Sequence, residues 1–285
     1  MKLRLPWYGG KQYLADEIIK LFPPHKVYVE PFGGGAAVLL NKPPSSVEVY
    51  NDINNHIVNF FRVLRDPEKF QLLYRRLSLT PHSREEHRDA CERYADETLD
   101  EVERAALFWT ATHQSLNGIT GGTWSRSTWQ SRRGMALKTS AWLGVIEGLP
   151  AVAERLLQVT IECSDFQRVI EAFDTPETLF YLDPPYLPET RVARDTYEHE
   201  MSVEDHVRML ETVLKVRGMV VLSGYPNGLY DGYLKGWRKV DFEVVERSTT
   251  GRTLDGGHIK APRVERVWMN YDPTCISSLF GEELP

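Results

Sequence analysis

The sequence has only three cysteines in 285 residues, and they lie far apart, at Cys91, Cys163 and Cys275. An odd number of distant cysteines argues against a disulfide framework and favours a reducing compartment. Their spacing fits no zinc motif, so we expect no metal. The first residues lack the apolar core of a signal peptide, and no apolar run is long enough to span a membrane. These absences favour a cytoplasmic enzyme.

An excess of positive charge is also missing, because 34 Lys and Arg face 40 Asp and Glu, a formal net charge of −6. A surface for nucleic acid would therefore have to be local. One stretch has that character, since no Asp or Glu lies between Arg104 and Glu147. About six acids would be expected there by chance at this protein's acid content.

Basic and aromatic side chains are interleaved in this acid-free stretch, together with several serines; they are Trp124, Arg126, Trp129, Arg132, Arg133 and Lys138. Basic, hydroxyl-bearing and aromatic residues on a flexible loop suit contacts with phosphates and bases. The plainer alternative is a solvent-exposed loop with scattered arginines. The missing acids favour nucleic acid.

The order of the predicted elements places this stretch inside an insertion. Strands are predicted for "KVYVEP" and "SVEVYNDIN", and "FGGGAAVLLN" between them is interpreted as a glycine turn that opens a helix. Residues 54–114 have the pattern of consecutive helices, and residues 11–21 and 149–157 also have helical spacing. Strands resume with "LQVTIEC", "TLFYLD" and "GMVVLSG", and "DFEVVER" and "VERVWMNY" are predicted as antiparallel edge strands.

This order predicts one α/β domain with a parallel sheet, interrupted by a mostly helical insertion. The sheet domain is predicted to be discontinuous and to comprise residues 1–56 and 158–275. The insertion comprises residues 57–157, and residues 276–285 form a tail.

A glycine turn, Gly33 to Gly35, follows the first strand of the sheet directly. Glycines let the backbone N–H groups of such a turn approach a ligand closely. The pattern differs from the dinucleotide motif GxGxxG, because Ala36 follows three consecutive glycines. Asp52 lies 19 residues beyond Gly33, at the end of the next strand, where an acid can accept hydrogen bonds from ribose hydroxyls. A helix cap is the alternative for Asp52.

Two further candidates are weaker by themselves. Asp165 in "ECSDF" follows a third strand and should share the carboxyl edge of the sheet with Gly33 and Asp52, the edge where open α/β sheets bind ligands. In isolation Asp165 is better explained as a helix cap. Trp7 and Lys11 flank a Gly-Gly turn in "PWYGGK", where a core tryptophan and a solvated lysine are the simpler interpretation.

The most specific motif is "YLDPPY", residues 181–186. Asp183 ends an apolar strand, and Pro184 and Pro185 stiffen the loop and leave its carbonyl groups free, because proline has no N–H. A carboxylate beside such a carbonyl offers two acceptors to one group that carries two hydrogens, as an exocyclic amine does. Tyr186 offers a flat face on which a base can stack. A plain proline turn would explain the prolines but not the acid.

Five motifs occur in one order: "PWYGGK", "VEPFGGGA", "VYNDIN", "IECSDF" and "YLDPPY". In this the chain resembles, over nearly its whole length, the Dam-type family of DNA adenine-N6 methyltransferases. The resemblance implies a Rossmann-like S-adenosylmethionine-dependent methyltransferase sheet with an inserted, mostly helical target-recognition domain. The insertion does not align with the family residue by residue, so the recognised DNA sequence stays open.

The resemblance also implies the roles of particular residues. S-adenosylmethionine would be the cofactor, bound by Trp7, Lys11, Glu30, Phe32, Gly33, Gly34, Gly35, Ala36, Asp52, Asp165, Phe166 and Asp183. The catalytic loop would comprise Asp183, Pro184, Pro185 and Tyr186. Double-stranded DNA would be bound by Asn117, Arg126, Trp129, Arg132, Arg133 and Lys138.

The reaction expected from these roles is site-specific methylation of adenine N6. The base must be flipped out of the duplex to be reached. Asp183 and the Pro184 carbonyl would accept the two N6 hydrogens and steer the nitrogen toward the methyl group, while Tyr186 stacks on the ring. Transfer would be direct and in line, with orientation and electrostatics supplied by the protein and no metal required.

Four alternatives remain at this stage. An N4-cytosine methyltransferase performs the same chemistry, although Ser-Pro-Pro-Tyr is its more usual motif. A glutamine-side-chain methyltransferase would have Asn in place of Asp183. A non-catalytic DNA-binding protein is disfavoured by the intact Asp183, and a nicotinamide dehydrogenase by the absence of GxGxxG. A cognate restriction endonuclease would be a partner in a restriction–modification pair; an orphan or phage methylase would have none.

Overall fold

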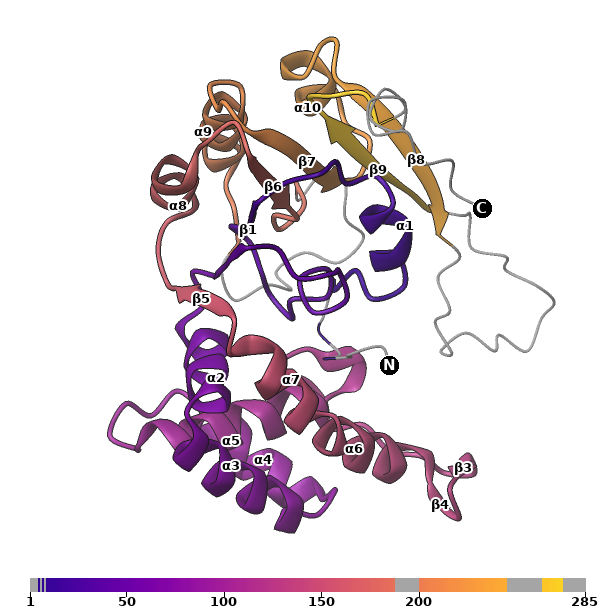
Figure 1. Ribbon diagram of the computed structural model, residues 1–285. Coiled ribbons are helices and arrows are strands. Elements are labelled where there is room, and N and C mark those ends of the chain that lie inside the picture. Colours follow the sequence, from indigo (N-terminus) through magenta and orange to yellow (C-terminus); the bar gives the residue numbers. More distant parts are fainter. Residues whose placement is uncertain (1–4, 6, 8, 188–199, 245–262, 274–285) are drawn as a thin grey trace, which may run out of the picture.

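Seven strands form one sheet in the computed structural model, which describes residues 5, 7, 9–187, 200–244 and 263–273 (Figure 1). The strands are β1 (Val27–Glu30), β2 (Val47–Asn51), β5 (Val159–Glu162), β6 (Thr178–Leu182), β7 (Met219–Gly224), β8 (Arg238–Val244) and β9 (Arg263–Met269). Their order is β5-β2-β1-β6-β7-β9-β8. The first five are parallel, and β9 is antiparallel to both neighbours. The predicted α/β sheet is confirmed, and β8 and β9 pair antiparallel to each other. Of these two, only β8 is an edge strand, because β9 also pairs with β7, so the predicted edge position of β9 was wrong. The predicted tail, 276–285, lies outside the described residues.

The central strands are apolar because both faces of the sheet are covered. Every residue of β6, "TLFYL", is buried. Side chains alternate along β1, so that Tyr28 packs with α1 (Ala15–Ile19) and Val29 packs with α8 (Phe166–Phe173) and α9 (Val203–Val213) on the opposite face. Figure 1 shows α8 and α9 side by side, across the sheet from α1. Helix α10 (Gly228–Tyr233) lies near β8 and β9, at the end of the sheet opposite β5.

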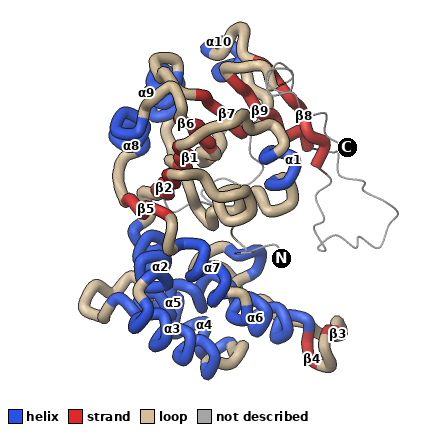
Figure 2. Tube along the Cα trace, in the orientation of Figure 1, coloured by secondary structure: helices blue, strands red, loops and turns tan. Residues whose placement is uncertain are grey.

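Six helices gather on one side of the molecule, beyond β5 (Figure 2). They are α2 (Asn55–Arg65), α3 (Pro67–Leu79), α4 (Arg84–Arg93), α5 (Glu101–His113), α6 (Leu137–Glu147) and α7 (Leu149–Leu156). The first four begin at side-chain caps, Asn54, Asp66, Ser83 and Asp100, each of which accepts a backbone N–H of the first turn. These four helices and α7 confirm the predicted helical segments.

The acid-free stretch contains regular structure that its sequence does not reveal. A short 3₁₀ turn, η1 (Leu116–Gly118), is followed by the hairpin β3 (Ser131–Arg132) and β4 (Met135–Ala136), and α6 begins directly after β4. Arg133 and Gly134 connect the two strands with positive φ angles of 59° and 74°. Such a two-residue turn matches the twist of a hairpin. The interpretation of the acid-free stretch as a flexible loop was therefore wrong at its C-terminal end.

Two predicted helices differ in the structure. The first helix covers only Ala15–Ile19, not residues 11–21. The segment "FGGGAAVLLN", residues 32–41, forms bends and turns and no helix. Gly34 and Ala36 have positive φ angles of 46° and 52°, which are incompatible with a right-handed helix.

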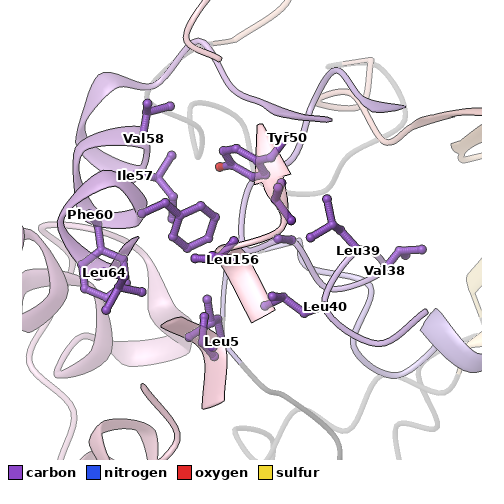
Figure 3. Close-up of a cluster of buried hydrophobic side chains, with 14 of the residues drawn as sticks. Leu5, Val38, Leu39, Leu40, Tyr50, Ile57, Val58, Phe60, Leu64 and Leu156 are labelled. Atoms are coloured by element: carbon purple, nitrogen blue, oxygen red, sulfur yellow. The ribbon is translucent and has the colours of Figure 1, made fainter. Parts of the chain in front are cut away.

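One hydrophobic cluster runs from the sheet into the helical part. Figure 3 shows Leu39 and Tyr50 from the sheet side close to Ile57, Leu64 and Leu156 from α2 and α7. The predicted division into residues 1–56 with 158–275 and residues 57–157 thus separates elements that share a core. Among the described residues, no helix is long and apolar enough to cross a membrane.

A buried ion-pair cluster also joins the two parts. Glu48 of β2 is bound by Lys42, at 2.6 Å, and by Arg155 of α7, at 2.8 Å, while Arg155 also donates to the Leu39 carbonyl. Burial raises the pKa of Glu48, but the hydrogen bonds from Arg155 and Lys42 outweigh burial, and its pKa lies below the ordinary value. The positive charges of Lys42 and Arg155 are therefore both paired with the one carboxylate of Glu48.

Replacing Glu48 with Ala should lower the free energy of unfolding by about 3–5 kcal/mol, because it leaves buried charges without their partner. Chemical denaturation at neutral pH measures the change. Glu177→Ala is the matched control, since Glu177 pairs with Lys26 at the surface and both are more than half exposed; it should cost under about 1 kcal/mol. Equal costs for the two variants would contradict the stabilising role of the cluster.

Candidate active site

A cavity of about 730 Å³ opens at the carboxyl ends of β1, β2, β5 and β6. The parallel strands bring the separate motifs to this edge, as expected for an open α/β sheet. Eleven of the predicted cofactor residues line it: Trp7, Lys11, Glu30, Phe32, Gly33, Gly34, Gly35, Asp52, Asp165, Phe166 and Asp183. Ala36 is fully buried and is not part of the lining.

The glycine turn is held against side chains that leave no room for a Cβ atom. A Cβ on Gly33 would lie 2.1 Å from the ring of Tyr50, whose hydroxyl donates to the Gly34 carbonyl. Gly34 has a positive φ and lies against the Trp7 indole. The backbone is therefore the surface that this turn presents to the cavity.

Asp52 both braces this turn and borders the cavity. Its carboxylate accepts the Gly34 N–H at 2.8 Å and the Asn54 N–H at 2.8 Å. The cap of α2 is Asn54, which accepts the His56 N–H. The helix-cap alternative for Asp52 was thus wrong, because Asn54 is the residue that caps α2. Asp52 instead holds the glycine turn at the end of β2.

Asp165 is clamped by a residue that no motif indicated. Arg208 of α9 donates to both of its oxygens, at 2.8 and 2.9 Å, and lies 4.2 Å above the ring of Phe166. The hydrogen bonds from Arg208 hold the pKa of Asp165 below its ordinary value. Asp165 also caps α8 through the Gln167 N–H. Phe32 and Phe166, with ring centroids 5.1 Å apart, give this end of the cavity an aromatic wall.

Asp183 lies at the end of β6 in a buried cluster with Lys11 and Glu265. The Lys11 ammonium is 2.7 and 2.9 Å from the Asp183 oxygens and 3.2 Å from Glu265 of β9. Lys11 is only 4% exposed, so the interpretation as a solvated lysine was wrong. The sequence analysis did not identify Glu265. Its signal in the sequence is that it alternates with Val267 and Met269 on the face of the strand that points into the protein.

Burial and ion pairing together determine the pKa values of the groups in this cluster. It raises the pKa values of Asp183 and Glu265, and Lys11 only partly offsets that effect. Burial alone would lower the pKa of Lys11, but the two carboxylates outweigh burial and raise it well above the ordinary value. Lys11 therefore stays charged, and the carboxylates share one cation.

Tyr186 does not line the cavity, whereas Pro184 and Pro185 do. The Tyr186 hydroxyl donates to Glu265 and lies 3.2 Å from Asp183 Oδ1. The edge of Tyr225 packs on its ring at 4.6 Å between centroids, and the Lys11 ammonium is 4.7 Å from the ring centroid. In this structure the ring is thus enclosed and is not presented for base stacking.

Glu30 adds a third buried carboxylate beside the cavity. Its Oε1 accepts the Tyr28 hydroxyl at 2.6 Å and the Leu39 N–H at 2.7 Å. Burial raises its pKa to about 8, although both hydrogen bonds oppose the change. Glu30 is therefore mostly a neutral acid at pH 7, and a cationic ligand in the cavity would favour its ionised form.

The predicted DNA contacts fall into two groups. Asn117 is exposed at a turn with φ 60°, and the following residues, Gly118 to Thr120, line the cavity. Arg126, Trp129, Arg132 and Arg133 are exposed, and the hairpin lies at the end of α6 that is remote from the sheet (Figure 1). Trp129 is 83% exposed. Arg133 pairs with Glu147, and Lys138, half-buried, lies in the first turn of α6.

No group of three or more His, Cys, Asp or Glu residues within the described ranges is arranged to hold a metal ion.

Comparison with known proteins identifies related chains. A family model described as "D12 class N6 adenine-specific DNA methyltransferase" matches residues 7–228. The "DNA N-6-adenine-methyltransferase" of Escherichia phage P1 is 28% identical over 235 residues, which are 78% of this chain but only 30% of that protein. The "Type II methyltransferase M1.LlaDCHI" of Lactococcus lactis is 29% identical over 71% of this chain and 72% of its own. The "DNA adenine methylase" of Haemophilus influenzae is 30% identical over 65% and 63%.

Replacing Glu30 with Gln should stabilise the protein at alkaline pH. The raised pKa means that ionising Glu30 costs the folded state, so this penalty grows as the pH rises from 4.5, its ordinary pKa, to about 8. Thermal unfolding of both proteins from pH 4 to 9 should show equal stability at the acid end. The variant should gain a few kcal/mol at the alkaline end, because each tenfold change in proton affinity is about 1.4 kcal/mol. Glu177→Gln should show no such divergence.

Proposed function

We propose, since the chain belongs to the D12 class of N6 adenine-specific DNA methyltransferases, that it methylates N6 of adenine in double-stranded DNA with S-adenosylmethionine as the methyl donor. The observation that carries this proposal is Asp183, followed by two prolines, at the edge of the cavity and paired with the buried Lys11. The family is adenine-specific, so the N4-cytosine alternative is not retained. The cytoplasm, where DNA and reduced cysteines occur together, is the compartment we propose.

The residues around the cavity fit S-adenosylmethionine. The donor supplies an electrophilic methyl group on a positively charged sulfur. The Asp183 carboxylate would face the cation, and the cation would favour the ionised form of Glu30. The turn at Gly33 and Gly34 admits a ligand to the backbone. The Asp52 carboxylate is positioned for ribose hydroxyls. The aromatic wall of Phe32 and Phe166 suits a purine, with Asp165 as an acceptor for its amino group.

Asp183 and the Pro184 carbonyl would orient the target amine. A flipped adenine brings N6 to the cavity, where both acceptors take its hydrogens and leave the nitrogen lone pair directed at the methyl group. The ion pair with Lys11 at 2.7 Å keeps Asp183 in place and favours its ionised form against the effect of burial. The chain thereby supplies orientation and electrostatic stabilisation.

The helical part would hold the DNA. The turn at Asn117 reaches from α5 to the cavity. The hairpin with Arg132, and the exposed Trp129 just before it, lie at the remote end of α6. We propose that the turn acts next to the target base and the hairpin on more distant phosphates and bases. Arg133 would exchange its exposed partner Glu147 for phosphate, an exchange that costs little at the surface.

Replacing Asp183 with Asn should lower single-turnover methylation at least about a hundredfold. The change removes the charge and adds an NH₂ donor that faces the target amine. Protein, labelled S-adenosylmethionine at saturation and duplex DNA are mixed, and the labelled base is identified after digestion. Asp89→Asn on the surface of α4 is the control, with unchanged activity. Methylation by the Asp183→Asn variant within a few-fold of the parent rate would make the loop a structural turn, and label on cytosine would refute adenine as the target.

Replacing Arg126 and Arg132 with Ala should flatten the salt dependence of DNA affinity by about two units of log–log slope, if both contact phosphate. Titrations of duplex DNA at several salt concentrations measure the slope. Cofactor affinity without DNA should stay the same. Arg75→Ala with Arg88→Ala removes two exposed arginines of α3 and α4 and serves as the charge-matched control. An equal slope in both double variants would argue against the acid-free stretch as a DNA surface.

A further inference from the structure

Glu265 occupies a buried position that no motif explains. It lies on β9, outside the residues that match the family, and its side chain is almost completely buried. It reaches the catalytic loop in two ways: it accepts the Tyr186 hydroxyl, and it lies 3.2 Å from the Lys11 ammonium. Asp183, Tyr186 and Glu265 thus form a continuous line of oxygen atoms that leads from the cavity into the sheet.

The net charge of Lys11, Asp183 and Glu265 indicates what this line of oxygen atoms can do. When both are ionised, Asp183 and Glu265 bring two negative charges against the single positive charge of Lys11. A bound sulfonium supplies the missing positive charge. Methyl transfer removes that charge, because the sulfur becomes a neutral thioether, and the target amine then has a proton to lose. A proton retained in the cluster would restore the balance.

We propose that Glu265 receives, through the Tyr186 hydroxyl, the proton that the target amine loses after methyl transfer. This inference rests on the proposed function and adds to it a positioning residue that acts through Asp183 and Tyr186. It also gives the enclosed tyrosine a role that requires no contact with the base.

The proposed steps conserve atoms and charge. The N6 lone pair forms the bond to the methyl carbon as the carbon–sulfur bond breaks and its electron pair stays on sulfur. The methylated nitrogen, now positive, gives one proton to Asp183. Asp183 passes a proton to the Tyr186 oxygen while Tyr186 passes its own to Glu265. Asp183 is then ionised again beside Lys11, and Glu265 is a neutral acid until product leaves.

The surroundings of Glu265 support a neutral acid there. The charged groups that act on it are Lys11, which favours ionisation, and Asp183, which opposes it; burial opposes it further and raises its pKa. Other titratable groups near the cluster are Tyr13, Tyr225, Tyr181, Tyr230 and Glu30. On the neighbouring strands, Gly224 and Ser223 of β7 lie opposite Arg266 and Val267, and Phe242 of β8 lies opposite Glu265.

The test follows methyl transfer and proton release in the same single turnover. The parent protein is mixed with S-adenosylmethionine and a duplex that it methylates, in weak buffer with a pH indicator, and quenched samples give the methylated base. We expect the proton to reach solvent later than the methyl group reaches adenine. During the lag, infrared difference spectra should show the carbonyl band of a protonated carboxylic acid.

Three variants make the test specific. Glu265→Gln and Tyr186→Phe should abolish both the lag and the infrared band, so that protons appear together with methylated base. Glu243→Gln, an exposed acid on β8, should keep both. Thermal unfolding establishes whether each variant is folded. If Glu265→Gln does not fold, Tyr186→Phe tests the proposal by itself.

Two results would overturn the proposal and can be told apart. A parent protein that methylates without a lag, or a Glu265→Gln variant that keeps the lag and the band, refutes the role of Glu265 and leaves the methyltransferase assignment intact. A folded parent protein that methylates no base in any duplex refutes the proposed function and this inference together.

Discussion

The ion pair between Lys11 and Asp183 is the contact on which the site depends. It joins residues 172 positions apart in the sequence at 2.7 Å and brings the N-terminal turn to the end of β6. The turn carries Trp7, which packs on the glycines after β1, so one contact orders both walls of the cavity. Because the pair is buried, removing either partner leaves the other charged and unsolvated, a strongly unfavourable state.

Much of this arrangement could be predicted from sequence, because it depends on local pattern. Apolar strands followed by glycine or acid place Gly33, Asp52, Asp165 and Asp183 at one edge, and parallel strands bring such ends together. Helices α2 to α5 were predictable from their spacing and caps. The helix expected within residues 32–41 does not form, because close packing of the glycines against Trp7 and Tyr50 imposes turns that the periodicity of the sequence does not reveal.

Contacts between distant elements were the part that sequence did not reveal. Arg208 lies on an ordinary amphipathic helix, and nothing local indicates that it clamps Asp165. Glu265 belongs to a strand paired antiparallel to β7, and only that pairing brings it to Lys11. The enclosure of Tyr186 follows from the same pairing. An aromatic ring next to a catalytic acid has two very different uses, and only the positions of its neighbours distinguish them.

The turn that contains Asn117 has two surfaces, and this has a thermodynamic consequence. Gly118 to Thr120 form part of the cavity wall, while Asn117 itself faces outward from the helical part. A ligand whose binding energy differs between two positions of this turn shifts the balance between them. By linkage, whatever factor the cavity ligand imposes on DNA affinity, DNA must impose on the affinity of that ligand. Under the proposed function, cofactor and duplex would then be reciprocal effectors of each other through this turn.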